Sequence, residues 1–457
     1  MESHLAAATQ DGLIQSLSHS LPNTANYILS RTNATFMPQG GNTYAPNGVR
    51  LIRFQIADST QFLDPHSVRL MFTLTNDAAQ AMQLLGAPMV LFQRCRLLCN
   101  GVVVEDLMYS HRLYDMMYKL NPRARNLSNL LEWPYAAEGA ADANVDTITA
   151  GASKRFLIDL PFGLFKQPLY LMLKACPITL EFELVKDSTE AVCSSVTAQA
   201  ALENASPAIA ALVVSQAFTL SDVQLKADTC TISQDLVERY NQHLLSGRPL
   251  PIPFTSYMTQ MQALTGAANF NVQVARAFSR LKTVYFTFWR DTKAIGSAAQ
   301  PNFLSQAQRS NLGVPNYFYY PAPGTGAVPP TAALTTATDT LQWQLMIGAK
   351  TWPVYPVRGV SETAYRLRAS LDQAQHGDID LKFTDYISTK FIAAIDVEKA
   401  AVGPGAGANF TGVSTRGGEQ LLIDIKGFPA PYPQRIYVSC HYDAILNLRA
   451  EGVEMLD

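Results

Sequence analysis

Three short stretches of the sequence carry residue types that could support catalysis or metal binding. The first, SCHYD, places Ser439, His441 and Asp443 at alternate positions, and these are the side chains that serine hydrolases use. Same-face neighbours on a strand stand ~6.5 to 7 Å apart with parallel side chains, whereas a catalytic triad needs contacts of ~2.6 to 3.2 Å. The stretch therefore predicts a structural strand, with Cys440 on the opposite face and out of reach of His441.

A pair of glutamates and an acidic loop are the other two candidates. Glu181 and Glu183 share one strand face at a separation compatible with a glycosidase pair, but such pairs flank a sugar from different segments. Their strand has an apolar opposite face, so they match the solvated side of a sandwich. His376, Asp378 and Asp380 could begin a metal site, yet no third segment supplies further ligands. We therefore expect no catalytic residue, no cofactor site and no metal site.

Composition favours a protein that associates with itself. The 457 residues have a net charge of −2, and 16% of them are charged, against about a quarter in a typical soluble domain. Hydrophobic content is 48%, so the chain is short of charge rather than rich in apolar residues. Interface cores are depleted in charge and enriched in aromatic residues and methionine, and this chain has 19 Tyr, 21 Phe and 13 Met.

Binding to nucleic acid, to a membrane or to zinc is not indicated. Among the first 50 residues the basic side chains are Arg31 and Arg50, so we expect no direct binding of nucleic acid. We expect no transmembrane segment, because the longest apolar runs fall far short of ~18 residues, and no secretory signal. The six cysteines include no Cys-x-x-Cys pair, and Cys95 and Cys99 lie too far apart on one strand for a disulfide.

Alternating strands dominate both halves of the chain. Residues 67–76 alternate between apolar and polar side chains, and Asn100-Gly101 between two apolar runs predicts a β-hairpin. Further strands are expected at residues 49–58, 271–278, 281–290, 341–347, 390–398, 419–426 and 434–448. Short helices are expected at residues 107–120, at 234–246 between the N-cap Ser233 and Gly247 just past the end, and at 361–373.

A proline-rich stretch separates the two halves. RPLPIPF has three prolines in five residues, from Pro249 to Pro253, which we interpret as a stiff linker that forbids helix and sheet pairing. The predicted fold is mainly β, with two tandem β-sandwiches, short helices and long loop insertions. The expected boundaries are an N-terminal arm at 1–47, a first domain at 48–247 and a second domain at 248–457, with long loops near 120–152, 186–215 and 292–338.

One strand, TVYFTFWRD, has large side chains on both faces. Val284, Phe286 and Phe288 point to one face, and Tyr285 and Trp289 point to the other. A sandwich strand in a soluble protein has one apolar face and one solvated face, so the second face needs a partner. Stacking on bases is a weak alternative, because one arginine among neutral residues makes no electrostatic groove. We expect a core on one side and an interface on the other.

Several segments, taken in order, carry a resemblance to a known family. They are FLIDLPFGLF, PLYLMLKACPITLEFEL, ISQDLVERYNQHLLSG, LPIPFTSY, LMIGAKTWPVYPVRGVSETAYRLRASL, FTGVSTRGGEQLLIDIKG and RIYVSCHYDAILNLRAEGVEMLD. Together they resemble major capsid proteins with two jelly rolls in one chain, from eukaryotic DNA viruses of the Polinton-like, virophage and large nucleocytoplasmic groups. The resemblance runs from about residue 49 to the last residue, and the short chain fits the Polinton-like branch best.

This resemblance implies two tandem eight-stranded jelly-roll β-sandwiches in a structural protein that is not an enzyme. Homotrimers would form pseudo-hexagonal capsomers that tile the icosahedral shell of a virion around double-stranded DNA. Tyr285 and Trp289 would be subunit-interface candidates, the long loops would form outer towers, and the N-terminal arm would tie capsomers together. Expected partners are further copies of the chain and penton and minor capsid proteins.

Other functions stay open at this point. A minor or vertex capsid protein usually carries one jelly roll, which the two halves argue against. A two-domain β-sandwich carbohydrate-binding protein or glycoside hydrolase should show convergent acids or exposed aromatic residues in a cleft, and normally a secretion signal. A domesticated capsid relative in a cellular genome would have the same pattern. The protein would be made inside the host cell, and the pattern does not distinguish nucleus from cytoplasm.

Overall fold

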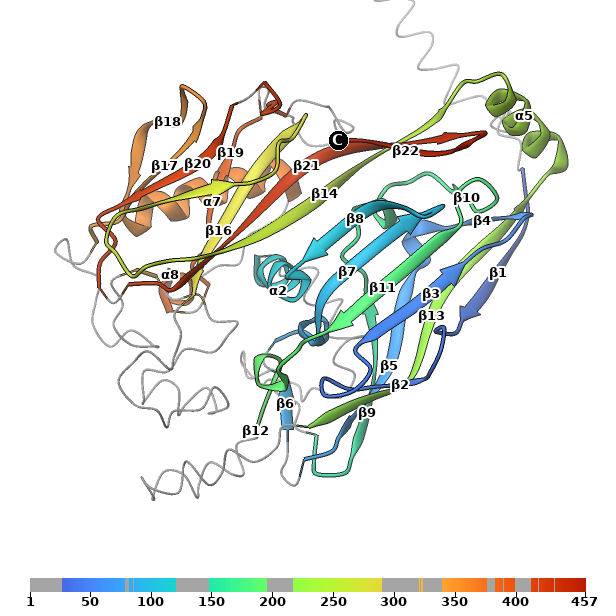
Figure 1. Ribbon diagram of the computed structural model, residues 1–457, viewed down its shortest axis with the longest axis horizontal. Helices are drawn as coiled ribbons and strands as arrows, with labels where there is room; N and C mark the ends of the chain where they lie inside the picture. Colours follow the sequence, from blue (N-terminus) through green and yellow to red (C-terminus); the bar gives the residue numbers. More distant parts are fainter. Residues whose placement is uncertain are drawn as a thin grey trace, which may run out of the picture.

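Two antiparallel β-sandwiches lie side by side, with helix α2 (Ser110–Leu120) between them (Figure 1). The structure is a computed structural model. It describes residues 27–78, 82–84, 86–120, 148–194, 217–289, 320, 322–323, 339–375, 383–388, 390–398, 412–417, 419–430 and 432–457. No helix in these ranges is both long enough and apolar enough to cross a membrane.

The first sandwich contains most of the strands before residue 233. They are β1 (Ile28–Phe36), β2 (Thr43–Tyr44), β3 (Leu51–Ile56), β4 (Gln61–Leu63), β5 (Arg69–Asn76), β7 (Phe92–Cys99), β8 (Val102–Met108), β9 (Ser153–Asp159), β10 (Leu171–Met172), β11 (Ile178–Leu184) and β13 (Phe218–Ile232). A separate two-stranded sheet pairs β6 (Met82–Leu84) with β12 (Val192–Ser194). Phe72 on β5 meets Phe92 on β7 edge to face at 5.7 Å, which ties the two sheets together in a shared core.

The second sandwich follows with an equivalent set of strands. They are β14 (Leu250–Ala263), β15 (Phe270–Val274), β16 (Leu281–Trp289), β17 (Gln342–Ile347), β18 (Lys350–Arg358), β19 (Ala393–Asp396), β20 (Leu421–Lys426), β21 (Arg435–Arg449) and β22 (Gly452–Leu456). Phe286 on β16 meets Trp343 on β17 edge to face at 5.0 Å. The indole Nε1 of Trp343 donates a hydrogen bond to Thr363 Oγ1 at 3.0 Å, which anchors helix α7 (Gly359–Gln375) to the core.

Both sandwiches have the same strand order. In the first, one sheet runs β1-β13-β5-β9 and the other runs β3-β11-β7-β8. In the second, the corresponding sheets run β14-β21-β16-β19 and β15-β20-β17-β18. Without the short strands β2, β4 and β10 of the first sandwich and β22 of the second, each sandwich has eight strands in the described residues. Numbered in chain order, both sets give 1-8-3-6 and 2-7-4-5. This is the jelly-roll arrangement, so the predicted mainly-β fold of two tandem eight-stranded jelly rolls is confirmed.

The predicted helices are present with small shifts of their ends. They are α2, α5 (Gln234–Leu245) and α7, and a short helix α8 (Phe383–Ser388) was not predicted. Single 3₁₀ turns are η1 (Pro65–Ser67), η2 (Pro88–Leu91), η3 (Gly163–Phe165) and η4 (Ser188–Glu190). The hairpin at Asn100-Gly101 is confirmed, since these two residues have φ of 48° and 80° and connect β7 to β8.

Two features of the structure differ from the expectations. The interpretation of Pro249 to Pro253 as an unpaired linker is wrong, because β14 pairs with β21 from Leu250 onward. β14 is an edge strand, so one of its two sides has no partner strand. Pro251 and Pro253 are two residues apart, so the positions where their N–H groups are missing lie on the same side of the strand. Prolines are tolerated in this arrangement. In addition, the expected arm contains β1, a polar edge strand whose exposed side chains leave no hydrophobic alternation to detect.

Candidate functional site

Ser439, His441 and Asp443 form a row along β21, and their contacts run to other strands. The hydroxyls of Ser439 and Thr259 lie 2.9 Å apart, and the ring of His441 stacks on Tyr257 with centroids 4.5 Å apart. Burial lowers the pKa of His441 to about 3, so its imidazole is neutral at physiological pH. The row is part of the packed sheet, as the strand geometry predicts.

Glu181 and Glu183 lie on the outer face of the first sandwich, among arginines. Arg96 Nη1 donates to Glu181 Oε2 at 3.0 Å, and Arg50 Nη2 lies 3.4 Å from Glu183 Oε1. These residues line a shallow surface pocket of about 430 Å³. Glu181 has its cation on the neighbouring strand β7, and Glu183 has its cation directly before β3. The two glutamates therefore belong to a row of surface ion pairs and are not arranged as the acid and base of a glycosidase.

The acidic loop with His376, Asp378 and Asp380 lies outside the described residues. Within the described ranges, no three His, Cys, Asp or Glu side chains are grouped so that they could hold a metal ion. Five cysteines in these ranges are buried and have free thiols. The structure thus assigns the described thiols to packing.

Both faces of β16 are buried, each by a different part of the chain. Phe286 and Phe288 lie in the core of the second sandwich, where their rings meet at 5.7 Å. Tyr285 and Trp289 lie on the other face, with 1% and 8% of their surface exposed. The guanidinium of Arg435 lies 4.6 Å from the ring centre of Trp289. The role of Tyr285 and Trp289 as subunit-interface residues stays a prediction, and the single chain already covers most of their surface.

Helix α2 of the first sandwich covers this second face. The guanidinium of buried Arg112 lies 4.1 Å from the ring centre of Tyr437 and 4.8 Å from that of Tyr320. Its Nη2 lies 3.5 Å from Thr287 Oγ1 on β16. Tyr109 meets Tyr437 edge to face at 5.3 Å. A cation held between aromatic faces away from water gains about 2 kcal/mol or more, so α2 joins the two jelly rolls firmly.

A second turn of α2 adds an acidic contact at the same junction. Asp115 Oδ2 accepts a hydrogen bond from the hydroxyl of Tyr320 at 2.8 Å. The same oxygen lies 2.7 Å from Lys119 Nζ. Burial lowers the pKa of Lys119, while the carboxylate of Asp115 opposes that shift. The junction is therefore a connected polar network that is closed to solvent, and sliding the two sandwiches would break several contacts at once.

A buried carboxylate joins the sandwiches at another point. Glu105 on β8 accepts hydrogen bonds from the backbone N–H groups of Gly163 at 2.9 Å and Leu164 at 3.0 Å. It also accepts one from the hydroxyl of Ser256 on β14 at 2.5 Å. Burial raises the pKa of Glu105 to about 7, against the opposing effect of these donors. A Cβ on Gly163 would stand 1.6 Å from the carbonyl oxygen of Thr255, so the close approach requires glycine there.

Glu105 and Arg112 join the two sandwiches, and neither was among the residues that the sequence singles out. Both are charged residues inside apolar or aromatic runs, VVVEDLM and SHRLYDMM. In a chain with so little charge, a charged residue in such a run indicates either a buried contact or a solvated face. The partners on β14, β16 and β21 decide between the two, and no local pattern identifies those partners.

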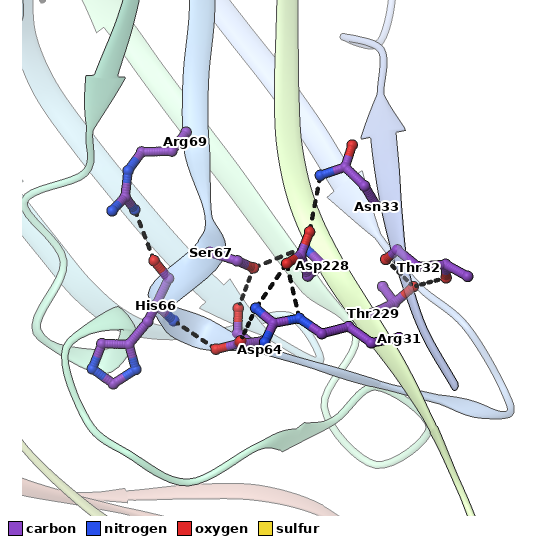
Figure 2. A network of polar contacts seen from close by, with 9 residues as sticks. All are labelled: Arg31, Thr32, Asn33, Asp64, His66, Ser67, Arg69, Asp228 and Thr229. Carbon is purple, nitrogen blue, oxygen red and sulfur yellow. Dashed lines mark hydrogen bonds and ion pairs between the residues drawn. The ribbon is translucent and has the colours of Figure 1, made fainter. Parts of the chain in front are cut away.

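Strand β1 is fixed to β13 by a polar network at its exposed edge (Figure 2). Arg31 Nη2 lies 2.6 Å from Asp64 Oδ2 and 2.7 Å from Asp228 Oδ2. Asn33 Nδ2 donates to Asp228 Oδ1 at 2.9 Å, and this bond is the main cause that lowers the pKa of Asp228. Exposed ion pairs contribute ~0 to 1 kcal/mol each to stability. The network therefore fixes the register in which β1 pairs with β13 and adds little to the free energy of folding.

The chain matches no known protein-family model, and no curated protein sequence is similar to it. Solved structures share its fold. A chain of the Sputnik virophage structure has a TM-score of 0.60 at 8% identity, over 96% of this chain and 90% of that one. PBCV-1 VP54, fitted into a reconstruction of Sputnik, gives 0.57 at 13% identity, over 96% and 100%. The Faustovirus major capsid protein gives 0.54 at 9% identity, over 95% and 94%.

These similarities extend over nearly the whole of each chain. At such low identities they establish a shared fold, the double jelly roll. They give no preference for the Polinton-like branch.

Proposed function

We propose that this chain is the major capsid protein of an icosahedral virus with a double-stranded DNA genome, and that three copies form a pseudo-hexagonal capsomer. The observation that carries the proposal is the pair of jelly rolls with one strand order, held side by side in one chain. Three such chains around a threefold axis would present six similar sandwiches, which is the repeat that a hexagonal lattice needs. The shared fold with the Faustovirus major capsid protein supports this function.

A rigid junction between the sandwiches supports the same function. A capsomer can tile a shell only if every copy has the same angle between its two jelly rolls. Two buried contacts cross between the sandwiches: the guanidinium of Arg112 lies on Tyr437, and the hydroxyl of Ser256 donates to Glu105. A change of angle would break both contacts. Since burying an unpaired polar group costs several kcal/mol, the network penalises other angles.

The surface of the second sandwich offers area for contacts between subunits. Val354 and Tyr355 on the edge strand β18 are 76% and 82% exposed, and Tyr365 on the adjacent helix α7 is 64% exposed. Large apolar side chains that gather on a surface mark interaction sites. We include these three residues in the subunit interface. Tyr285 and Trp289 stay in the proposal as subunit-interface candidates that lie on the face of β16 under α2.

The remaining partners and the location follow from this function. Capsomers would contact one another and would meet penton and minor capsid proteins at the vertices and on the inner side of the shell. The protein would reside in the virion after synthesis in the host cell. Charge on the chain is nearly balanced, at −2, so contact with the genome would be indirect.

Light scattering after size exclusion, followed by negative-stain microscopy, tests the proposal on the purified chain. We expect a particle of three 50.1 kDa chains with a roughly hexagonal outline. Tyr355→Asp should reduce it to a monomer with unchanged circular dichroism, whereas Leu245→Asp, at a 78% exposed site on α5, should leave the trimer intact. A wild-type monomer at all concentrations, or one that binds glycans, would contradict the capsid function.

A further inference from the structure

An apolar pocket of about 350 Å³ opens beside α5, where β14 begins. Its walls come from the starts of β1 and β14, from β4, from β10 and the turn before it, from α5, and from the ends of β13 and β21. Figure 1 shows α5, β4, β10 and the start of β1 gathered at one end of the molecule. The volume lies at the lower end of the range for ligand-binding pockets.

The pocket exposes apolar surface that the described chain does not cover. Phe62 and Tyr240 form one wall, with ring centroids 6.4 Å apart. On the rim, Tyr27, Leu169 and Tyr170 are 45%, 46% and 37% exposed. No Lys, Arg, Asp or Glu is among the lining residues in the described part of the chain. The occupant that suits such a lining is a row of aliphatic side chains without charge.

We infer that this pocket binds the N-terminal segment of the same chain, through Leu13, Leu17 and Leu21. Tyr27 lies on the rim, and β1 runs from Ile28 onward, so the 26 preceding residues are attached beside the pocket. Leu21 is six residues before Tyr27, a distance that extended backbone spans in at most ~20 Å. The segment can therefore reach the pocket without help from another chain.

The composition of the segment matches the lining. Leu13, Leu17 and Leu21 recur every four residues, which is the spacing of one helix face. The charged side chains among the first 26 residues are Glu2 and Asp11, and both precede the leucines. A short tether also gives an effective concentration of about millimolar, so a segment with weak intrinsic affinity still occupies its site.

Fluorescence anisotropy with a labelled peptide of residues 5–26 tests this inference on the full chain. A variant carrying Leu13→Ser, Leu17→Ser and Leu21→Ser should have an open pocket and bind the peptide at least ~10-fold more tightly than the wild type. A peptide with the same three serines should not bind. The test uses the chain in solution, so its result is independent of capsid assembly.

Two further variants identify the site. Leu169→Glu, added to the three serines, should weaken peptide binding at least ~10-fold, because it places a charge on the apolar rim. Leu456→Glu is the matched control, since this leucine is 43% exposed but does not line the pocket, and it should not change binding. Binding to the wild type as tight as to the serine variant would overturn the inference, as would no binding at all. Dimers that form only with intact leucines would also overturn it, because a second copy would then be the donor.

Discussion

Replacing Glu105 with glutamine should remove a measurable part of the pH dependence of folding stability. Burial raises the pKa of Glu105 in the folded chain to about 7, from the ordinary 4.5 that applies to the unfolded chain. Between these values the folded chain keeps a proton that the unfolded chain has released. The contribution of this carboxyl group to stability is therefore complete below about pH 4.5 and is lost as the pH rises through 7.

The size of this contribution follows from the two pKa values. A pKa that moves from 4.5 to about 7 corresponds to about 3 kcal/mol, and most of this, about 2.5 kcal/mol, is lost between pH 5 and pH 8. The positive charge of Lys166 favours the ionised carboxylate, as do the three hydrogen-bond donors, and burial outweighs all of them. Glutamine carries no proton to lose, so the variant lacks this component at every pH.

Urea unfolding at pH 5, 6, 7 and 8 measures the effect. The free energy of unfolding of the wild type should fall by about 2.5 kcal/mol more than that of Glu105→Gln over this range. Other titrating groups are common to both proteins and cancel in the difference. Glu451→Gln, in the exposed turn between β21 and β22, is the control and should behave as the wild type. Parallel pH profiles for wild type and Glu105→Gln would refute the link between burial and protonation.

Three other substitutions test the junction and the subunit interface. Gly163→Val should lower stability by about 3 kcal/mol or more in urea unfolding, because its side chain would meet the carbonyl of Thr255; an unchanged midpoint would contradict the close approach. Arg112→Ala should cost about 2 kcal/mol or more, since it removes a buried cation from the face of Tyr437, and a neutral effect would show that the contact is not stabilising. Trp289→Asp should stop trimer formation in light scattering, and a normal trimer from this variant would exclude an interface role.

Local sequence patterns predict many of the strands. Apolar residues at alternate positions mark β5 and β11, and the structure buries alternate residues of both. Asn100-Gly101 predicts a tight hairpin because both residues tolerate positive φ. The same approach failed at β1 and β14. A polar edge strand shows no alternation, and prolines on an edge strand face away from the hydrogen-bonded partner.

The amino-acid sequence by itself determined which segments are strands and that two sandwiches follow each other. Both properties depend on the alternation of apolar and polar residues and on turn residues a few positions apart. Each segment therefore shows them without reference to the rest of the chain. Only the tertiary structure decided the surroundings of the large side chains on the second face of β16 and of the buried charges Arg112 on α2 and Glu105 on β8. Glu105 meets Ser256, 151 residues further along the chain, and Arg112 meets Thr287, 175 residues away. A contact over such distances is set by how two finished sandwiches pack, and no local periodicity specifies it.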